Sequence, residues 1–345
     1  MNEAFSALSN YAQKYSSLNS LWFVDENYDV SANPVFITST EAVTNRIDIA
    51  DYLKQYGSVN LSDYDCTQYA DASFDVVYLR VPKAKALLNH LIREAMRILK
   101  PQGRLICVGF NDEGIKNTFK KIEKAFGELV EQELLGKGLR IAEFSLINPK
   151  VDQIEDRDYA VIKLIANELS LSLLSKAGIY GAEKIDQGSL FLCETVLQHH
   201  DHKTFEKVLD IGCGNGLISL VLAKTFASSE FIATDNNITA VTLCELNFAN
   251  NDVKGSVILD DCADTIASKQ FDLIVSNPPF HQGFDTSENL TIRFLAATER
   301  LLTKRGEAWF VMNRFLKVES LAKKTSLQMD LMNENSQFKI LRFRK

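Results

Sequence analysis

The sequence predicts an α/β protein of two tandem domains, each built on a doubly wound sheet. Its 345 residues exceed the length at which one hydrophobic core usually remains single. In the second half, short apolar segments alternate with helical stretches, which is the pattern of a parallel sheet covered on both faces. The first half repeats part of this pattern without a ligand-binding loop. These observations indicate a duplicated, Rossmann-like architecture with one degenerate copy.

The second half has the clearest periodicity. Its expected strands are short apolar segments, and they are 207–210, 231–234, 256–259, 271–276, 307–312 and 338–341. The expected helices have apolar residues at helical spacing, and they are 217–226, 238–250 and 290–302. Because strands and helices alternate, we expect a mostly parallel sheet.

The first half is interpreted as a degenerate copy of the second. Residues 74–77 (Phe-Asp-Val-Val) align with 271–274 (Phe-Asp-Leu-Ile), and Pro82 falls where Pro279 falls. An internal duplication is the simplest account of this match. Residues 1–73 contain only one glycine, so we expect no glycine-rich ligand loop in the first copy.

The composition is that of an ordinary globular protein, with 46% apolar and 24% charged residues. No segment reaches the roughly 18 uninterrupted apolar residues of a membrane span, and the polar start lacks the layout of a signal peptide. The six cysteines show no paired spacing, so neither a disulfide framework nor a zinc site is predicted. We expect a cytoplasmic protein with no membrane association and no metal ion.

Charge is distributed unevenly along the chain. The formal net charge is -7, but from Arg293 onward twelve Lys or Arg face five Asp or Glu, a surplus of seven that leaves -14 on the preceding residues. The overall charge argues against a protein that binds nucleic acid by electrostatics alone. The basic carboxyl-terminal edge is either an RNA-facing patch or a set of solvated helix faces.

The most specific local motif is a glycine-rich loop at 208–216, between an expected strand and an expected helix. Gly212, Gly214 and Gly216 permit a tight turn and let the main chain approach a ligand closely. The spacing differs from the Gly-x-Gly-x-x-Gly of dinucleotide enzymes. Asp210 stands at the strand end, where its carboxylate could meet the ammonium group of a methionine moiety. The loop therefore favours S-adenosylmethionine over NAD.

Two further strand ends carry acidic residues. Asp235 ends the next strand, about where an acidic side chain accepts both ribose hydroxyls in such sheets. After the third strand, Asp260 or Asp261 could accept a hydrogen bond from the adenine amine, and Asp261 is preferred. The alternative is that these aspartates only cap turns and helices, which is common for Asp at strand ends.

A second motif, Asn277-Pro278-Pro279-Phe280, follows the apolar segment 271–276. An exocyclic amine conjugated to its ring is a poor nucleophile until acceptors hold its two hydrogens. The side-chain oxygen of Asn277 and the carbonyl of Pro278 can supply these acceptors. Phe280 offers a face on which an extruded base can stack. The motif predicts methyl transfer by in-line displacement from a sulfonium, achieved by positioning.

Other targets fit the same local chemistry. Motifs of the Asn-Pro-Pro-Phe type also serve methylation of adenine N6 and of protein glutamine N5, because each target is a conjugated NH₂ group. From a different class comes the hypothesis of a non-catalytic RNA-binding assembly factor that retains the fold. The intact glycine loop and tetrapeptide motif weigh against that hypothesis, because a domain that no longer catalyses a reaction loses such motifs by sequence drift.

Taken together, the motifs resemble those of the ribosomal RNA small subunit methyltransferase C family, which makes N2-methylguanine. The resemblance covers nearly the whole length and includes the run 185–189 (Ile-Asp-Gln-Gly-Ser), the loop 210–216 and the run 276–283 (Ser-Asn-Pro-Pro-Phe-His-Gln-Gly). It implies methylation of a guanine N2 in 16S ribosomal RNA, with the small ribosomal subunit as partner and a monomeric enzyme. Related methyltransferases of a large-subunit guanine share both motifs and remain the alternative.

The resemblance also implies roles for further residues. Asp186 and Gly188 belong to a segment that closes over the cofactor. Pro279, His281 and Gln282 border the pocket of the target base. One departure stands in this region: relatives commonly read Phe-Ser-Arg where this chain has Tyr180-Gly181-Ala182, so the contact of that arginine is missing or is replaced, with Lys184 as the candidate.

These interpretations predict three segments. Residues 1–147 form a degenerate methyltransferase-like domain with a structural or RNA-binding role, residues 148–175 a linker and β-hairpin, and residues 176–345 the catalytic domain. Trp22 and Trp309 are expected in the cores. His199, His200 and His202 lie close together in sequence but have no paired acidic or cysteine ligand, so exposed loop residues are expected there instead of a metal site.

Overall fold

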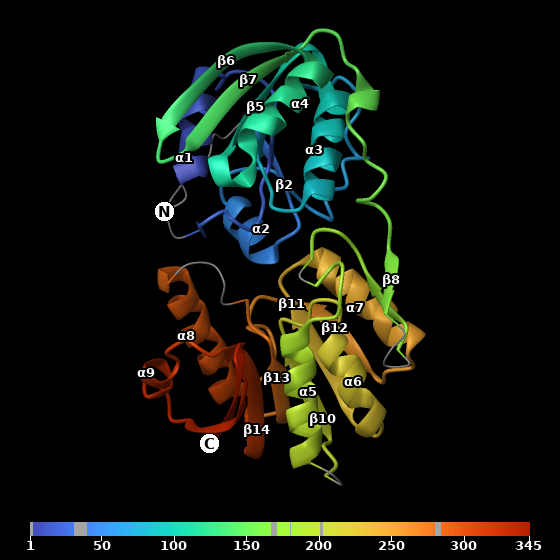
Figure 1. The fold of residues 1–345 in the computed structure, drawn as a ribbon, viewed down its shortest axis with the longest axis vertical. Helices are drawn as coiled ribbons and strands as arrows, with labels where there is room; N and C mark the ends of the chain where they lie inside the picture. Colours follow the sequence, from blue (N-terminus) through green and yellow to red (C-terminus); the bar gives the residue numbers. More distant parts are fainter. Residues whose placement is uncertain (1–2, 31–39, 167–170, 180, 201–202, 280–283) are drawn as a thin grey trace. The chain divides into compact units, whose positions relative to one another are not determined.

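The computed structural model describes residues 3–30, 40–166, 171–179, 181–200, 203–279 and 284–345. The chain divides into two compact units, Met1–Val161 and Ile162–Lys345, called unit 1 and unit 2 below (Figure 1). The boundary lies inside the segment 148–175, which the sequence analysis assigns to a linker and hairpin. Each unit has its own sheet, so the predicted α/β fold with two tandem sheets is confirmed.

In its described part, unit 1 has a seven-stranded sheet in the order β3-β2-β1-β4-β5-β7-β6. The first five strands in this order are parallel, and β7 pairs antiparallel with both β5 and β6. The strands are β1 (Ser20–Phe23), β2 (Thr40–Thr44), β3 (Val59–Leu61), β4 (Phe74–Arg80), β5 (Leu99–Phe110), β6 (Gly127–Gly136) and β7 (Leu139–Leu146). The helices are α1 (Glu3–Lys14), α2 (Ile47–Leu53), α3 (Lys85–Ile98) and α4 (Ile115–Phe126), with 3₁₀ turns at Asn111–Glu113 and Val151–Gln153.

Within the residues described for unit 2, the main sheet has the same plan, in the order β12-β11-β10-β13-β14-β16-β15. Again the first five strands are parallel, and β16 pairs antiparallel with both β14 and β15. The strands are β10 (Lys207–Ile211), β11 (Glu230–Asp235), β12 (Gly255–Leu259), β13 (Phe271–Ser276), β14 (Leu302–Asn313), β15 (Gln328–Glu334) and β16 (Phe338–Arg344). The shared order of the two sheets agrees with the predicted duplication.

The helices of unit 2 cover both faces of this sheet. They are α5 (Gln187–His199), α6 (Leu217–Thr225), α7 (Ile238–Asn250), α8 (Phe284–Leu301) and α9 (Glu319–Ala322). Figure 1 shows α5, α6 and α7 on one side of the strands and α8 and α9 on the other. A separate apolar cluster fills each side. The carboxyl ends of β10, β11, β12, β13 and β14 therefore meet at one edge, between two buried cores.

Two differences from the sequence analysis concern elements of unit 2. β15 is absent from the expected strands, because it is an outer strand whose side chains are exposed or half-buried and show no apolar alternation. The last long helix begins at Phe284 and ends at Leu301, and β14 starts directly after it at Leu302. The segment 159–175 contains β8 (Lys163–Ala166) and β9 (Leu173–Ser175), which pair antiparallel, in agreement with the β-hairpin expected there.

No helix in the described part of the chain is long and apolar enough to cross a membrane. Trp22 and Trp309 are 1% and 0% exposed, so their predicted core positions are confirmed.

Candidate active site

The glycine-rich loop connects β10 to α6 at the carboxyl edge of the sheet. Gly212, Gly214 and Gly216 have φ angles of +74°, +55° and +84°, in the left-handed region where a side chain is unfavourable. A Cβ at Gly216 would lie 2.7 Å from the Sγ of Cys244, whereas a Cβ at Gly214 would meet nothing within 4 Å. The loop thus packs closely on α7 at one end and borders open space in its middle.

The next strand holds this loop in place. The amides of Gly212 and Cys213 donate to the carbonyl oxygen of Thr234 at 2.8 and 2.9 Å. The amide of Gly214 donates to Oδ2 of Asp235 at 2.9 Å, and Oδ1 of Asp235 accepts from the amide of Asn237 at 2.9 Å. Asp235 therefore supports the loop from the end of β11, in addition to the ribose contact expected from the sequence.

Asp210 is fully buried in β10 behind the loop. Its Oδ2 accepts a hydrogen bond from the hydroxyl of Ser219 at 2.8 Å, while its Oδ1 is buried without a hydrogen-bond partner among the described residues. Burial raises the pKa of this carboxyl to about 7, although the Ser219 hydrogen bonds oppose the rise. A buried carboxylate oxygen that lacks a donor fits a cationic ligand, because the desolvated charge remains uncompensated without one.

The two acidic candidates after β12 have different surroundings. The carboxylate of Asp260 is 3% exposed and accepts three hydrogen bonds of 2.7–3.0 Å from Asp264 and Thr265 in its own turn. Asp261 accepts from Nδ2 of Asn236 at 3.2 Å and pairs with Arg293 at 2.8 Å. Asp260 is therefore committed to the turn, and Asp261 faces the end of β11, next to the glycine loop.

Asn277 follows β13 directly and is held by the first turn of α5. Its Nδ2 donates to Oδ2 of Asp186 at 2.8 Å and to the hydroxyl of Ser189 at 3.0 Å. The same oxygen of Asp186 caps α5 by accepting from the amide of Ser189 at 2.6 Å. Because a carboxylate can only accept, it fixes the amide group of Asn277 with its NH₂ toward α5. The Oδ1 of Asn277 then points elsewhere, and none of the described residues donates to it.

The tetrapeptide region is tied to the loop region by Ser276. Its buried hydroxyl donates to the carbonyl oxygen of Ile211 at 2.6 Å, which joins the ends of the neighbouring strands β10 and β13. Pro278 is buried and Pro279 is exposed. The predicted residues Phe280, His281 and Gln282 lie outside the described residues.

Gly188 lies in the first turn of α5, where a Cβ would come within 3.1 Å of the Phe338 ring and 3.3 Å of the Asp186 carboxylate. A larger residue there would therefore press on the side chain that orients Asn277. The family resemblance implies that Asp186 and Gly188 close over the cofactor; in the structure Asp186 contacts Asn277, and Gly188 lies next to the Asp186 carboxylate.

Sequence reasoning missed two supporting side chains, Ser219 and Arg293, and placed Ser189 only within the run 185–189 that the resemblance assigns to closing over the cofactor. The contact between Asp186 and Ser189 could also have been predicted, because an Asp three residues before it at the start of a helix has the spacing of an N-cap. Ser219 and Arg293 carry no local signal, since their partners Asp210 and Asp261 are distant in sequence.

The histidine segment differs from the expectation. His199 ends α5 and is exposed, but His200 is only 5% exposed. Its ring packs against Phe205 and Trp309, with centroid distances of 5.1 and 5.5 Å. The expectation of exposed loop residues is therefore wrong for His200, because these aromatic rings cover it. His202 lies outside the described residues.

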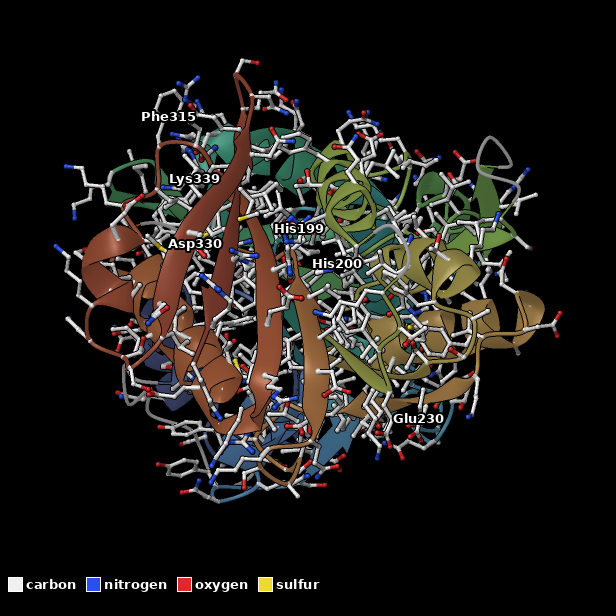
Figure 2. The ribbon with its side chains drawn as sticks, turned by 90° about the horizontal axis from the view of Figure 1, so that it is seen from below. His199, His200, Glu230, Phe315, Asp330 and Lys339 are labelled. Atoms are coloured by element: carbon white, nitrogen blue, oxygen red, sulfur yellow. The ribbon has the colours of Figure 1, made fainter. Side chains whose placement is uncertain are left out.

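His199, His200 and Glu307 bring possible metal-ligand atoms within 4.8 Å of one another, and the two histidines are neighbours in Figure 2. Two cationic side chains already occupy these atoms. Lys203 Nζ lies 2.7 Å from Oε1 of Glu307, and Arg342 Nη1 lies 3.0 Å from Nε2 of His199. Positive charges in direct contact oppose a metal cation, so we interpret the group as a structural ion cluster.

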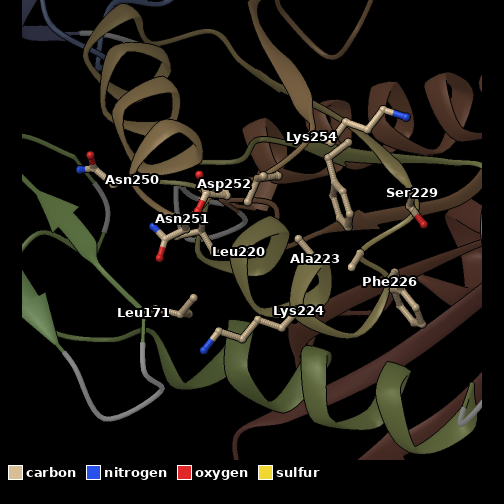
Figure 3. A pocket seen from close by; sticks show the side chains of 13 residues that line it. Leu171, Leu220, Ala223, Lys224, Phe226, Ser229, Asn250, Asn251, Asp252 and Lys254 are labelled. Atoms are coloured by element: carbon tan, nitrogen blue, oxygen red, sulfur yellow. The ribbon is translucent and has the colours of Figure 1, made fainter.

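A pocket of about 390 Å³ lies where β11 and β12 begin (Figure 3). Its lining includes Leu171, Lys224 and Asn251, and none of the predicted site residues. Ligands of such sheets bind at the carboxyl ends of the strands. The pocket is at the opposite edge, so we assign the active site to the glycine loop and the Asn277 region.

Comparisons with known proteins identify the family of this chain. The family model described as "Methyltransferase small domain" matches residues 170–342, and "Methyltransferase small domain N-terminal" matches residues 33–132. A protein of Shewanella halifaxensis named "Ribosomal RNA small subunit methyltransferase C" is 30% identical over 290 residues, which are 84% of this chain and 83% of that protein. A protein of the same name from a Marinomonas species is 30% identical over 71% of this chain and 70% of its own length.

A solved structure has the same overall fold. It is a T. thermophilus 16S rRNA N2 methyltransferase in complex with AdoMet and guanosine. It matches with a TM-score of 0.75 and 21% identity, over 95% of this chain and 88% of its own. This match extends through both units and supports the two-domain fold.

Proposed function

Since the chain belongs to the ribosomal RNA small subunit methyltransferase C family, we propose that it methylates the exocyclic N2 of a guanine in 16S ribosomal RNA, with S-adenosylmethionine as methyl donor. The observation that carries this proposal is the orientation of Asn277. Its NH₂ group is held by Asp186 and Ser189, which leaves Oδ1 as an acceptor beside the cofactor loop. A guanine N2 needs such an acceptor, because its lone pair is delocalised into the ring.

The residues of the chain act mainly by positioning the target amine. Oδ1 of Asn277 and the carbonyl of Pro278 hold its two hydrogens, so that the nitrogen lone pair is directed out of the ring plane. S-adenosylmethionine supplies an electrophilic methyl group when bound. Because the target nitrogen gains positive charge on methylation, the two acceptor oxygens would stabilise that charge. The extra proton then leaves to solvent.

The cofactor is held by residues of neighbouring strand ends. The buried Oδ1 of Asp210 would receive the cofactor ammonium group, which compensates an oxygen that has no donor among the described residues. Gly214, where a Cβ would meet nothing within 4 Å, would lie beside the nucleoside. Asp235 would bind the ribose hydroxyls while supporting the loop, and Asp261 would accept from the adenine amine.

Finer assignments follow from the same family membership. We place the enzyme in the cytoplasm, as a monomer that acts on ribosomal RNA within the small subunit. The six cysteines are free and buried, which suits a reducing compartment. Unit 1 serves as a degenerate domain that contributes structure or RNA contacts.

The decisive experiment supplies radiolabelled S-adenosylmethionine and unmodified RNA. Transcribed 16S and 23S RNA, and small and large subunits reconstituted from them, are tested separately, followed by nucleoside analysis. We expect label as N2-methylguanine in the 16S RNA, most efficiently in small subunits. Label confined to 23S RNA, to adenine or to protein would contradict the proposal, as would the absence of label in every sample.

A further inference from the structure

Phe315 is an exposed aromatic residue at the same edge as the active site. Its side chain is 80% exposed, more than any other large apolar residue in the described part of the chain. It lies two residues beyond the end of β14, which runs parallel to β13. Because parallel strands end at the same edge, Phe315 and Asn277 follow the carboxyl ends of neighbouring strands.

The register of these strands limits the distance between the two residues. Ser276 pairs with Phe310, so Asn277 is level with position 311. With strands about 4.8 Å apart and a rise of about 3.3 Å per residue, Asn313 is roughly 8 Å from Asn277 between Cα atoms. Phe315 lies farther from Asn277, in a turn that bonds to Gln337 beside β16, and we place it within reach of RNA that flanks a guanine bound at Asn277.

The turn that carries Phe315 is firmly built. The amide of Phe315 donates to Oδ1 of Asn313 at 3.0 Å, and the amide of Arg314 donates to the carbonyl of Gln337 at 2.9 Å. The buried Lys339 donates to the carbonyl of Leu316 at 2.6 Å and to Glu319 at 2.8 Å. Figure 2 shows Phe315 and Lys339 near each other and apart from His199 and His200. An exposed ring on such a fixed turn is preorganised for contact with a partner.

Positive charge surrounds this ring in the sequence. Between residues 313 and 324 the chain has four cationic residues and one acidic residue, Glu319, and the cations are Arg314, Lys317, Lys323 and Lys324. All four cations are exposed. Arg314 lies 3.7 Å from Glu334, with both side chains nearly half exposed, and such a pair is weak enough to exchange for a phosphate. An aromatic ring among exposed cations matches the chemistry of single-stranded RNA, which offers stacking faces and phosphates.

We infer that Phe315 is a stacking platform for an unpaired RNA base that flanks the target guanine, with Arg314 and Lys317 contacting the adjoining phosphates. The inference rests on the proposed function and adds to it a residue that selects the substrate. Stacking on Phe315 holds the flanking nucleotide while the target base is extruded toward Asn277. An apolar protein partner would use the ring differently, because it would gain nothing from the surrounding cations.

The test compares Phe315→Ala and Phe315→Trp in the full chain, with Leu331→Ala as the matched control. Leu331 is also an exposed apolar residue of unit 2, at 55% exposure, but it lies within β15. We expect Phe315→Ala to raise the KM for 16S RNA about 10- to 100-fold, with little change in kcat. Phe315→Trp should retain the wild-type KM, and Leu331→Ala should leave it unchanged. Cofactor affinity, measured by calorimetry, should be the same in all four proteins.

The cations are tested separately by the salt dependence of RNA binding. Arg314→Ala combined with Lys317→Ala should lower the slope of log affinity against log salt by about 1 for each phosphate that is no longer bound. An unchanged KM in Phe315→Ala, or an equally raised KM in the Ala and Trp variants, would overturn the stacking role while the proposed function stands. If the unaltered protein labels no ribosomal RNA, the proposed function fails, and the inference fails with it.

Discussion

The two sheets of this protein have the same strand order, but their carboxyl edges differ in chemistry. Strand register aligns Trp22 of β1 with Asp210 of β10, because each lies beside the same position of the next strand. The buried Trp22 ring packs on Tyr78 at 5.1 Å, where unit 2 has the Asp210 carboxylate, whose Oδ1 has no hydrogen-bond partner among the described residues. The indole of Trp22 thus fills the position at which unit 2 has a side chain able to make a polar contact.

The same alignment places Val24 at the position of Gly212 and Arg80 at the position of Asn277. Arg80 is buried and pairs with Asp25 and Glu113. In unit 1 the charge at the end of β4 is therefore neutralised within the protein, whereas in unit 2 none of the described residues donates to the amide oxygen of Asn277. The fold survives when the edge is filled, since the apolar strands and helices that stabilise it lie away from the edge.

The largest effect is expected where the two edges differ in chemistry. Asn277→Ala should lower kcat about 100- to 1,000-fold, with a smaller stability loss of about 1–2 kcal/mol, because the hydrogen bonds to Asp186 and Ser189 are removed as well. Arg80→Ala should instead destabilise the protein by about 3–5 kcal/mol, because it leaves the carboxylate of the buried Asp25 without its cation. Methyl transfer assays and denaturant unfolding of both variants test this. A stability loss in the first variant with normal kcat would contradict the assigned roles.

A second test introduces the residue of unit 1 into the loop of unit 2. Gly212→Val puts a branched side chain at a φ of +74°, a strain of about 1–3 kcal/mol. We expect S-adenosylmethionine affinity to fall about 10-fold or more, as measured by calorimetry. Val24→Gly is the reciprocal control and should leave cofactor binding unchanged, since Trp22 still fills the neighbouring space. Equal affinities for both variants would show that the loop does not hold the cofactor.

The pH dependence of cofactor binding follows from Asp210. Burial raises its pKa to about 7 in the free protein, and only the carboxylate attracts the cofactor ammonium group. Affinity should therefore rise with pH through 7 and level off above it. Asp210→Asn should bind weakly with a flat profile between about pH 6 and 8. The raised pKa also affects folding. As pH rises from the ordinary carboxyl pKa of 3.8 toward about 7, Asp210 ionises in the unfolded chain before it does in the folded protein, so the folded state loses stability. The Asn variant should therefore gain stability relative to wild type over that range.

The smallest effect concerns a charged pair that is reversed between the units. Glu307 lies 3.9 Å from Arg342 in unit 2, and the aligned positions in unit 1 are Arg104 and Glu143, at 3.6 Å. Burial opposes ionisation of Glu307, but hydrogen bonds from His200 and Lys203 outweigh it and lower its pKa to about 2. A depressed pKa gives stability that is present above the ordinary value of 4.5 and is lost as pH falls toward 2.

The contribution of Glu307 at neutral pH should be about 1–2 kcal/mol, since Lys203 is half exposed and partly screened. Denaturant unfolding of wild type and Glu307→Gln at about pH 7, 4 and 3 measures it. The difference between the two proteins should shrink as the pH falls. A difference that stays constant would mean that packing around the side chain, and not its charge, accounts for the effect.

Local sequence was sufficient to predict those parts of the candidate site that are contiguous in the chain. The glycines of the loop and the Asn277-Pro278 pair each lie in one short segment after an apolar strand, so their spacing could be read directly. The duplication could be read in the same way. Strands at the edge of the sheet were harder to predict, because an outer strand such as β15 is largely exposed and has no periodic apolar pattern.

The amino-acid sequence by itself determined the α/β class, the doubled sheet and the two motifs, because these depend on periodicity and on residues adjacent in the chain. Only the tertiary structure decided which atom of Asn277 is available, since the Asp186 carboxylate that orients it is 91 residues away. It also decided that Asp260 is used within its own turn and that His200 is buried under Trp309. These outcomes depend on hydrogen bonds and packing between distant segments, and local pattern carries no information about them.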